Sequence, residues 1–248
     1  MINAKSLLIL ACWLVLMPMS VRAEEASEIL RKADSFRLSS ANLQVDVEIQ
    51  TFNQDGSLSN ERKYLVFAQS QRRSLVLMQS PSEKGQKVLM LGDDYWLLMP
   101  GTARPIRITP MQKLLGDAST GDIASMSWSD DYSAELVGHE VCEALACTHL
   151  QLTANSRSVN YQRIELWVGK THREPLKAEL YVQSDKLAKV AKFVTDNPFA
   201  PKEMVEMILQ DRLSNRKETR VRYAARKERS VPAQWLNPMY LAANPKID

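Results

Sequence analysis

The stretch at residues 92–108 reads Gly-Asp-Asp-Tyr-Trp-Leu-Leu-Met-Pro-Gly-Thr-Ala-Arg-Pro-Ile-Arg-Ile. Its apolar run, residues 95–99, lies between turn residues and the Pro-Gly pair at 100–101. Aromatic enrichment and these two turn boundaries predict a strand rather than a helix. Because both alternating sets of side chains are apolar, we expect the strand to be covered on both faces. Residues 104–108 then predict a return strand, and residues 84–91 the strand before it.

Strands predicted elsewhere are joined by short connections. They lie at residues 43–50, 64–68, 74–79, 132–141, 148–153, 161–168, 175–183, 187–194, 204–209 and 219–223. The first shows the clearest alternation, with Val45 and Val47 on the face opposite Asp46 and Glu48. Residues 204–209 also fit a helical pattern. Consecutive strands with short turns predict an antiparallel meander rather than a parallel sheet with crossover helices.

Helices are predicted at three places. Residues 25–36 carry one apolar stripe at helical spacing, which fits a helix packed on the sheet. Residues 110–115 and 122–128 each fit a short helix. These two helices fit either a lid over the sheet or a surface crossover, and the sequence alone leaves both alternatives open.

The N-terminus predicts export. Residues 1–23 have a charged start at Lys5, a short apolar core and a breaker at Pro18, which is typical of a cleaved signal peptide and too short to span a membrane. A lipoprotein cleavage before Cys12 is disfavoured, because it would leave an exposed apolar N-terminus. Removal of Lys5 and Arg22 lowers the net charge from +3 by two, to +1. This balance gives no indication of nucleic-acid binding.

Cys142 and Cys147 are the two of the three cysteines that lie outside the predicted signal peptide. They flank a short turn between two predicted strands, so in an oxidising compartment we expect them to form a disulfide. A zinc site would need His139 and His149 as well, and the spacing does not favour that tetrahedral set. We therefore predict no metal.

No motif for a nucleophile elbow, a zinc protease or a phosphate loop is present in the sequence. The histidines fall near predicted hairpin ends, where a structural role is the commoner one. A basic run at 212–229 fits either a solvated strand face or a dock for anionic groups. We find no repeat or linker, so residues 24–248 are predicted to form one domain with no cofactor and no catalytic site.

Four motifs in order resemble a known family. They are the Lys-Gly strand at 84–91, Trp-Leu-x-x-Pro at 96–100, Arg-Pro-x-Arg-Ile at 104–108, and Gly-Asp-Ala-Ser-x-x-Asp-Ile at 116–123. Together they resemble the outer-membrane lipoprotein-sorting family, in its LolA-like branch. The resemblance implies an α+β fold: a strongly curved antiparallel sheet, or incomplete β-barrel, closed by an N-terminal helix and short lid helices.

The resemblance also implies a function. We expect a periplasmic carrier that binds lipid or lipoprotein acyl chains non-covalently in an apolar cavity. Its partners would be an inner-membrane transporter or an outer-membrane acceptor, and no nucleic acid. The alternative is a sensor or accessory module of an envelope transport complex with the same fold. The side chains expected to line the cavity are Val45, Val47, Leu77, Met90, Tyr95, Leu97, Met99 and Met126.

Arg104 and Arg107 are candidates for the cavity mouth. Their offset of three places them on opposite faces of a strand, unless a bulge at Pro105 redirects one of them. We expect one of them to lie at the mouth, where it would hold a carbonyl or phosphate group or bond the backbone of the lid. The alternative is that both are surface residues. The family uses a barrel arginine in lid closure, but the resemblance maps that role onto neither position.

Overall fold

The computed structural model describes residues 19–115, 118–125, 127–143, 145–212 and 218–247. Thirteen strands form one antiparallel sheet in the order β6-β5-β4-β3-β2-β1-β15-β14-β13-β12-β11-β10-β9. Their bounds are β1 Asn42–Phe52, β2 Leu58–Gln69, β3 Arg73–Met78, β4 Lys87–Leu91, β5 Asp94–Leu98, β6 Ile106–Ile108, β9 Tyr132–Cys142, β10 Leu145–Ala154, β11 Arg163–Gly169, β12 Pro175–Tyr181, β13 Leu187–Thr195, β14 Met204–Asp211 and β15 Glu218–Glu228.

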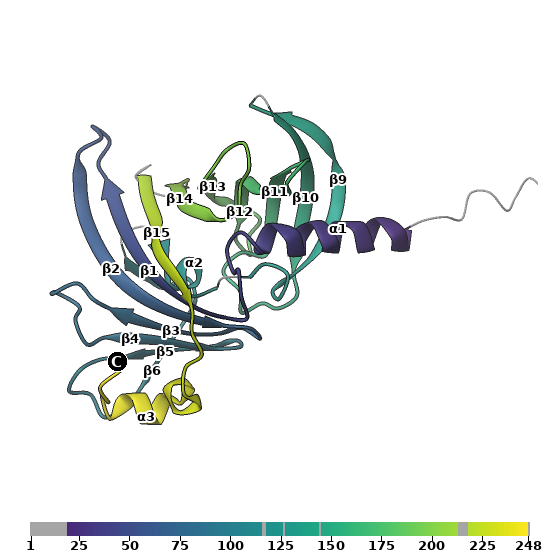
Figure 1. Ribbon diagram of the computed structural model, residues 1–248. Coiled ribbons are helices and arrows are strands. Elements are labelled where there is room, and N and C mark those ends of the chain that lie inside the picture. The colour runs from purple at the N-terminus through teal and green to yellow at the C-terminus, as the bar shows by residue number, and fades with distance from the viewer. Residues whose placement is uncertain (1–18, 116–117, 126, 144, 213–217, 248) are drawn as a thin grey trace, which may run out of the picture.

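The sheet curves so strongly that β1 and β2 face β9, β10 and β11 across a central space (Figure 1). Its end strands β6 and β9 do not pair with each other, so the barrel stays open. Register shifts interrupt the ladders, for example between Asp46 and Val47 and between His149 and Leu150. Such bulges bend a strand and increase its twist. The predicted α+β incomplete barrel is confirmed.

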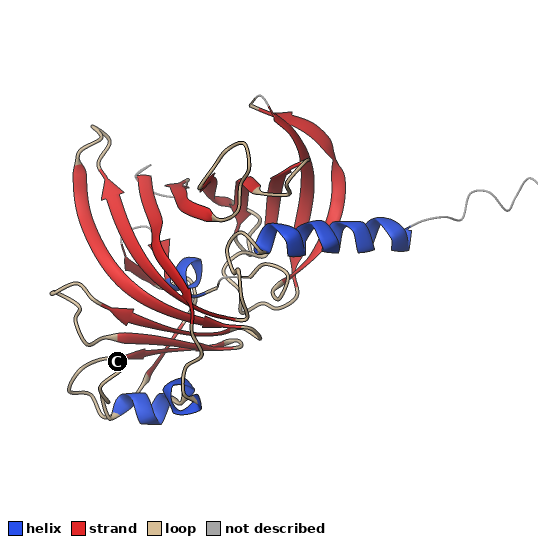
Figure 2. Ribbon diagram, in the orientation of Figure 1, coloured by secondary structure: helices blue, strands red, loops and turns tan. Residues whose placement is uncertain are grey.

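The concave face carries the main apolar core. In β1, Val45 and Val47 are buried there while Asp46 is exposed, as the alternation predicts. Helix α1, Met19–Asp34, adds a buried stripe that includes Ile29 and Leu30. It packs against β9 and is the longest of the helices drawn in blue in Figure 2. The predicted helix therefore exists, although it begins earlier and ends sooner than residues 25–36.

A second apolar cluster covers the convex face. The C-terminal segment forms a 3₁₀ helix η1, Ala233–Leu236, and helix α3, Pro238–Ala242, which lie outside β3 to β6 (Figure 1). Trp235 packs edge-on against Phe67 of β2, with ring centroids 5.4 Å apart. This cluster explains why β3 to β5 are apolar on both faces.

The region between β6 and β9 differs from its prediction. Lys113–Leu115 is not helical but forms strand β7, which pairs with β8, Ala118–Ser119. The backbone and hydroxyl of Thr120 both donate to the carbonyl of Gln112 at 3.0 Å, which closes this hairpin. The next helix, α2, is Thr120–Ala124 rather than residues 122–128. Local propensity was overridden by these cross-hairpin bonds.

Cys142 and Cys147 form the predicted disulfide, with Cα atoms 5.9 Å apart at the end of the β9–β10 hairpin. The ring nitrogens of His149 lie 2.9 Å from Glu140 and 2.8 Å from Glu165. Among the residues described, no group of three metal-ligating side chains converges.

Replacing both cysteines by serine is expected to lower the free energy of unfolding by about 2 kcal/mol, the lower end for so short a loop. Urea denaturation of the variant and the parent measures this difference. Adding a reductant should destabilise the parent and leave the variant unchanged. Equal free energies of unfolding for the variant and for the parent with its disulfide intact would contradict the prediction.

Candidate functional site

A short segment crosses the concave face between two facing walls of the sheet, one that contains β1 and β2 and one that contains β9, β10 and β11. We call it the plug: residues 118–131, of which 126 lies outside the described residues. It contains α2, which lies inside the curve of the sheet (Figure 1). All five residues of α2 are buried. The plug therefore occupies the space that an incomplete barrel would otherwise offer to a ligand.

The first half of the plug is fixed by a buried ion pair. Asp122 of α2 accepts from Nζ of Lys189 on β13 at 2.6 Å, and the side chains are 3% and 5% exposed. Asp122 also accepts from the Tyr161 hydroxyl at 2.7 Å and from the Ser119 backbone at 2.8 Å. Burial works to raise the pKa of Asp122, but Lys189 and these donors outweigh it, so the pKa is lowered.

Close packing adds to this anchor. Gly121 lies so near Asn160 that a Cβ at this position would be 2.5 Å from the Cγ atom of Asn160. The Asn160 amide in turn lies 2.9 Å from the Ser119 hydroxyl. Any side chain at position 121 would have to displace the Asn160 amide from this place.

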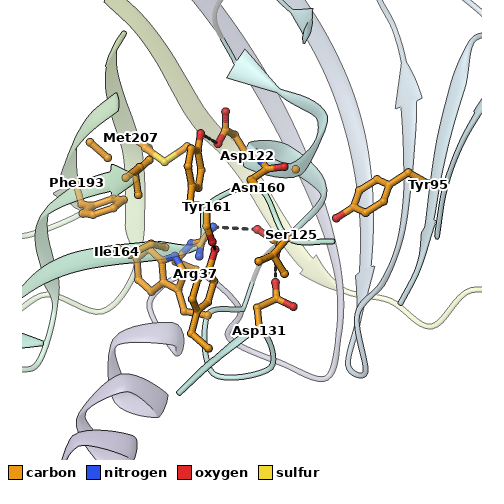
Figure 3. Close-up of a pocket in the computed structure, with 16 residues that line it drawn as sticks. Arg37, Tyr95, Asp122, Ser125, Asp131, Asn160, Tyr161, Ile164, Phe193 and Met207 are labelled. Atoms are coloured by element: carbon orange, nitrogen blue, oxygen red, sulfur yellow. Dashed lines mark hydrogen bonds between the residues drawn. The ribbon is translucent and has the colours of Figure 1, made fainter. Parts of the chain in front are cut away.

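The second half of the plug lies over Arg37, which follows α1 in the chain. Nη2 of Arg37 donates to the carbonyl of Ser125 at 3.0 Å (Figure 3). The guanidinium also stacks on Trp128, 4.1 Å from the ring centroid. Trp128 meets Phe193 of β13 edge-on at 5.5 Å. One buried cation thus holds both the backbone and an aromatic side chain of the plug.

Two buried carboxylates complete the attachment. Asp34 accepts from the backbone of Trp128 at 2.7 Å and of Ser129 at 2.6 Å. Asp131 accepts from the Ser125 hydroxyl at 2.8 Å and pairs with Arg72 at 2.5 Å. Burial raises the pKa of both carboxyls, although Arg37 for Asp34, and the Ser125 hydroxyl and Arg72 for Asp131, act in the opposite direction.

A cavity of about 50 Å³ remains beside the plug. That space admits only a few water molecules, since one water needs roughly 10–15 Å³ by this measure. Its walls come from the segment after α1, the plug, the connection between β10 and β11, and strands β5, β9, β11, β12, β13 and β14. Figure 3 shows the lining side chains. The lining residues are Arg37, Tyr95, Gly121, Asp122, Ser125, Trp128, Asp131, Tyr132, Val159, Asn160, Tyr161, Ile164, Leu180, Ala191, Phe193 and Met207.

Of the eight side chains expected to line a cavity, Tyr95 borders this one. Val45, Val47 and Met90 lie in the concave core, and Leu97 is half-buried against it. Met90 also borders a second cavity of about 10 Å³ beside Arg72 and Arg73.

The other three are placed differently. Leu77 lies in the convex cluster, because the register of β3 turns Val76 and Met78 inward instead. Met99 follows β5 and is 40% exposed. Met126 lies outside the described residues.

Neither arginine proposed for the mouth borders the cavity. Arg107 pairs with Asp94 and lies over the ring of Trp96, 4.9 Å from its centroid, on the convex side. Arg104 is exposed in the turn between β5 and β6. The arginines that contact the plug are Arg72, which pairs with Asp131, and Arg37, which donates to Ser125. The signal of Arg37 in the sequence was only its place beyond the apolar stripe of α1, which does not reveal a partner 88 residues away.

The basic run at 212–229 is largely used within the fold. Arg222 pairs with Glu206 at 2.7 Å, and Arg226 with Glu203 at 3.0 Å. Arg229 donates to Gln44 at 2.9 Å. Arg216 and Lys217 lie outside the described residues. These pairs favour the solvated strand face over an anion dock on the outer surface.

A search for membrane-spanning helices, confined to the described parts of the chain, finds no helix with the length and apolar character to cross a bilayer. No curated protein matches the sequence. A family model described as "Uncharacterized protein" matches residues 70–243.

Solved structures give closer matches. A LolA superfamily protein from Nitrosomonas europaea is 33% identical, with a TM-score of 0.79, covering 87% of this chain and 99% of that one. A domain from Vibrio parahaemolyticus described as an outer membrane lipoprotein-sorting protein has a TM-score of 0.70 at 18% identity, covering 87% and 97%. A DUF1329 family protein from Desulfovibrio piger has a TM-score of 0.69 at 18% identity, with the same coverage.

The last two likenesses concern the fold alone. The Nitrosomonas match combines substantial identity with nearly complete coverage of the relative. Its TM-score of 0.79 agrees with the shared fold. The chain therefore belongs to the LolA superfamily.

Proposed function

We propose that this protein is a periplasmic carrier that binds lipid or lipoprotein acyl chains non-covalently on the concave face of its sheet. The observation that carries the proposal is the plug. It covers an apolar concave core, yet polar contacts attach both of its halves: Asp122 with Lys189 in the first, and Asp131 with Arg72 in the second. A segment attached in this way can be exchanged for a ligand without unfolding the sheet.

The energetics favour such an exchange. The cavity of about 50 Å³ is too small for an acyl chain, so binding requires the plug to move. Each methylene transferred from water to the concave face contributes about 0.8 kcal/mol. A chain of ten methylenes thus supplies roughly 8 kcal/mol against the loss of the plug contacts. The carrier would release its cargo to a receptor that binds the acyl chain more favourably, and the plug would then return to its closed position.

Location and partners are part of the same proposal. Export by cleavage after Ala23 remains a prediction, since residues 1–18, including Cys12, lie outside the described part of the chain. Transfer implies an inner-membrane transporter that supplies the cargo and an outer-membrane protein that accepts it. The expected chemistry is binding and release without a covalent step.

Protein purified without detergent should contain extractable lipid and should bind a neutral fluorescent acyl probe. Arg37→Leu removes one plug contact and should increase the affinity for this probe about five-fold, because the open form becomes more populated. Arg107→Leu is the matched control and should bind as the parent does. Mass spectrometry of extracts and fluorescence titration measure these results.

Absence of both lipid and probe binding would contradict the proposal. A second assay separates a carrier from a sensor: incubation with membranes that contain lipoprotein. A carrier should move lipoprotein into solution in stoichiometric amounts. A stable complex with a protein partner, formed without such release, would favour the sensor.

A further inference from the structure

The loop between β13 and β14, residues 196–203, carries an aromatic side chain that the fold does not cover. Phe199 is 88% exposed, the largest exposed fraction among the large hydrophobic side chains in the described parts of the chain. Burial of such a ring in an apolar environment is favourable. A single exposed apolar side chain is nevertheless ordinary on a protein surface, so exposure alone does not indicate a partner.

The backbone around Phe199 has no free hydrogen-bond donor. Two side chains, those of Asp196 and Asn197, accept from it through their Oδ1 atoms. The donors are the N–H groups of Lys202 at 2.9 Å and Glu203 at 3.1 Å to Asp196, and those of Phe199 at 2.9 Å and Ala200 at 3.3 Å to Asn197. Positions 198 and 201 are prolines, which have no N–H. From residue 198 to residue 203, every backbone N–H is therefore either bonded inside the loop or absent.

This backbone suits contact with an environment poor in water. A backbone donor that leaves water without a partner is strongly unfavourable, and for this reason open loops are excluded from the apolar part of a bilayer. Phe199 can leave water without stranding such a donor, because those at the tip already have partners. The same bonds order the loop before contact, which reduces the entropy that binding would cost. The free carbonyl oxygens of the tip can remain hydrated if insertion is shallow, at the level of the lipid headgroups.

The charges of the loop balance. Lys202 is exposed and offsets the carboxylate of Asp196. Glu203 pairs with Arg226 at 3.0 Å. The loop therefore has no excess of either sign that would bind it to an oppositely charged protein surface. Its contact with a partner should depend on the Phe199 ring rather than on long-range attraction.

Further apolar side chains lie on the same part of the surface. Val194, at the end of β13, is exposed next to the loop. Two residues before it, Lys192 pairs with Glu143 at 3.0 Å, which brings the tip of the β9–β10 hairpin to β13. That hairpin exposes Val141 and Leu145. Exposed apolar side chains thus extend from the hairpin towards the loop.

The base of the loop is joined to the segment that holds the plug. The backbone N–H of Met204 donates to the carbonyl of Phe36 at 2.9 Å, and Arg226 donates to the same carbonyl at 3.4 Å. Phe36 directly precedes Arg37, which donates to Ser125 of the plug. A partner that binds the loop would therefore lie beside one attachment of the plug.

We propose that the loop at 196–203 docks the protein on the surface of a phospholipid bilayer, with the Phe199 ring inserted below the headgroups. The contact is weak and reversible, because one ring buries much less apolar area than a membrane-spanning helix or two lipid chains. The inference goes beyond the proposed function, since it concerns where the protein meets the membrane. It holds for a carrier and for a sensor.

The test is sedimentation of the whole protein with vesicles of dioleoylphosphatidylcholine, whose headgroups have no net charge. Titration with lipid gives a partition coefficient, which Phe199→Ser should lower about ten-fold. Phe199→Trp should retain it or raise it, because the ring is kept. The melting temperature of both variants should equal that of the parent, since the side chain is exposed. High salt should leave the binding of the parent unchanged.

Met239→Ser is the matched control. Met239 lies in α3 and is 64% exposed, so its replacement also removes one exposed apolar side chain. This variant should bind vesicles as the parent does. The inference is overturned if the parent does not bind, if both serine variants lose the same amount, or if high salt removes binding that Phe199→Ser leaves intact.

Two further measurements distinguish the alternatives. Sedimentation velocity without lipid tests self-association: a parent dimer that Phe199→Ser dissociates, without vesicle binding by either protein, would assign the loop to a second copy of the chain and overturn bilayer docking. Titration with the fluorescent acyl probe without vesicles tests the proposed function separately. Phe199→Ser should bind the probe as the parent does. Failure of the parent to bind the probe would contradict the carrier and leave the docking result unaffected.

Discussion

A protein whose plug is covalently fixed is expected to lose acyl binding by more than about a thousand-fold. The variant Gly121→Cys/Asn160→Cys offers this link, because a Cβ at Gly121 would lie 2.5 Å from the present Cγ of Asn160. That Cγ marks the position a cysteine sulfur would take. With the disulfide formed, α2 stays attached to the connection between β10 and β11 that holds position 160, and a chain has only a cavity of about 50 Å³. Titration with the fluorescent acyl probe measures the loss.

Reduction should restore binding in the same sample. The reductant also opens the native Cys142–Cys147 bridge, so the parent treated with the same reductant is the first control. Gly121→Cys alone is the second control, because it introduces the crowding at Asn160 without the link. If the oxidised double variant binds the probe as the parent does, the plug does not have to move, and the proposed binding mode is wrong.

Lys189→Met is expected to lower the free energy of unfolding at neutral pH by about 3–5 kcal/mol. The substitution leaves Asp122, whose side chain is 3% exposed, as a buried carboxylate without its cation. The Tyr161 and Ser119 donors remain, but they carry no charge. Urea denaturation of parent and variant gives the difference. A loss below 1 kcal/mol would mean that the ion pair does not hold α2 in place.

The dependence on pH has opposite signs in the two proteins. In the parent, the pKa of Asp122 is lowered from 3.8, so its contribution is present above that value and is lost as the pH falls further. In Lys189→Met, burial acts without the cation and raises the pKa. The variant should therefore regain stability relative to the parent as the pH falls towards 4. The double variant Asp122→Asn/Lys189→Met should be more stable than Lys189→Met at neutral pH, because no uncompensated charge stays buried.

Much of the fold could be predicted from local patterns. Alternation in β1 indicated its buried face, and the two cysteines around a short turn predicted their pairing. Alternation failed at β3, where Leu75 and Leu77 face the convex cluster while Val76 and Met78 face the concave core. A strand that is apolar on both faces gives no periodic signal about which side is inside. For this reason the sequence did not show that Leu77 faces the convex cluster.

The candidate site was harder to predict because its contacts are long-range. Arg37 meets Ser125 across 88 positions, and Lys189 meets Asp122 across 67. The sequence around each of these residues contains no motif that indicates a buried partner. A buried lysine on a strand becomes informative only when the facing carboxylate is known. The motif at 116–123 overlaps the plug. Arg104 and Arg107, which were expected at the cavity mouth, lie in an exposed turn and on the convex face.

The unpaired end strands β6 and β9 have a mechanical consequence. In a closed barrel, strand number and stagger fix the circumference, so widening the interior means breaking ladder hydrogen bonds. In this open sheet the circumference is not fixed, because the two walls can separate by a change of curvature while every strand keeps its hydrogen-bonded neighbours. The C-terminal helices pack on β3 to β5 and α1 packs on β9, so each wall is expected to move together with its own helix. The volume inside the curved sheet would then adjust continuously to the size of the cargo.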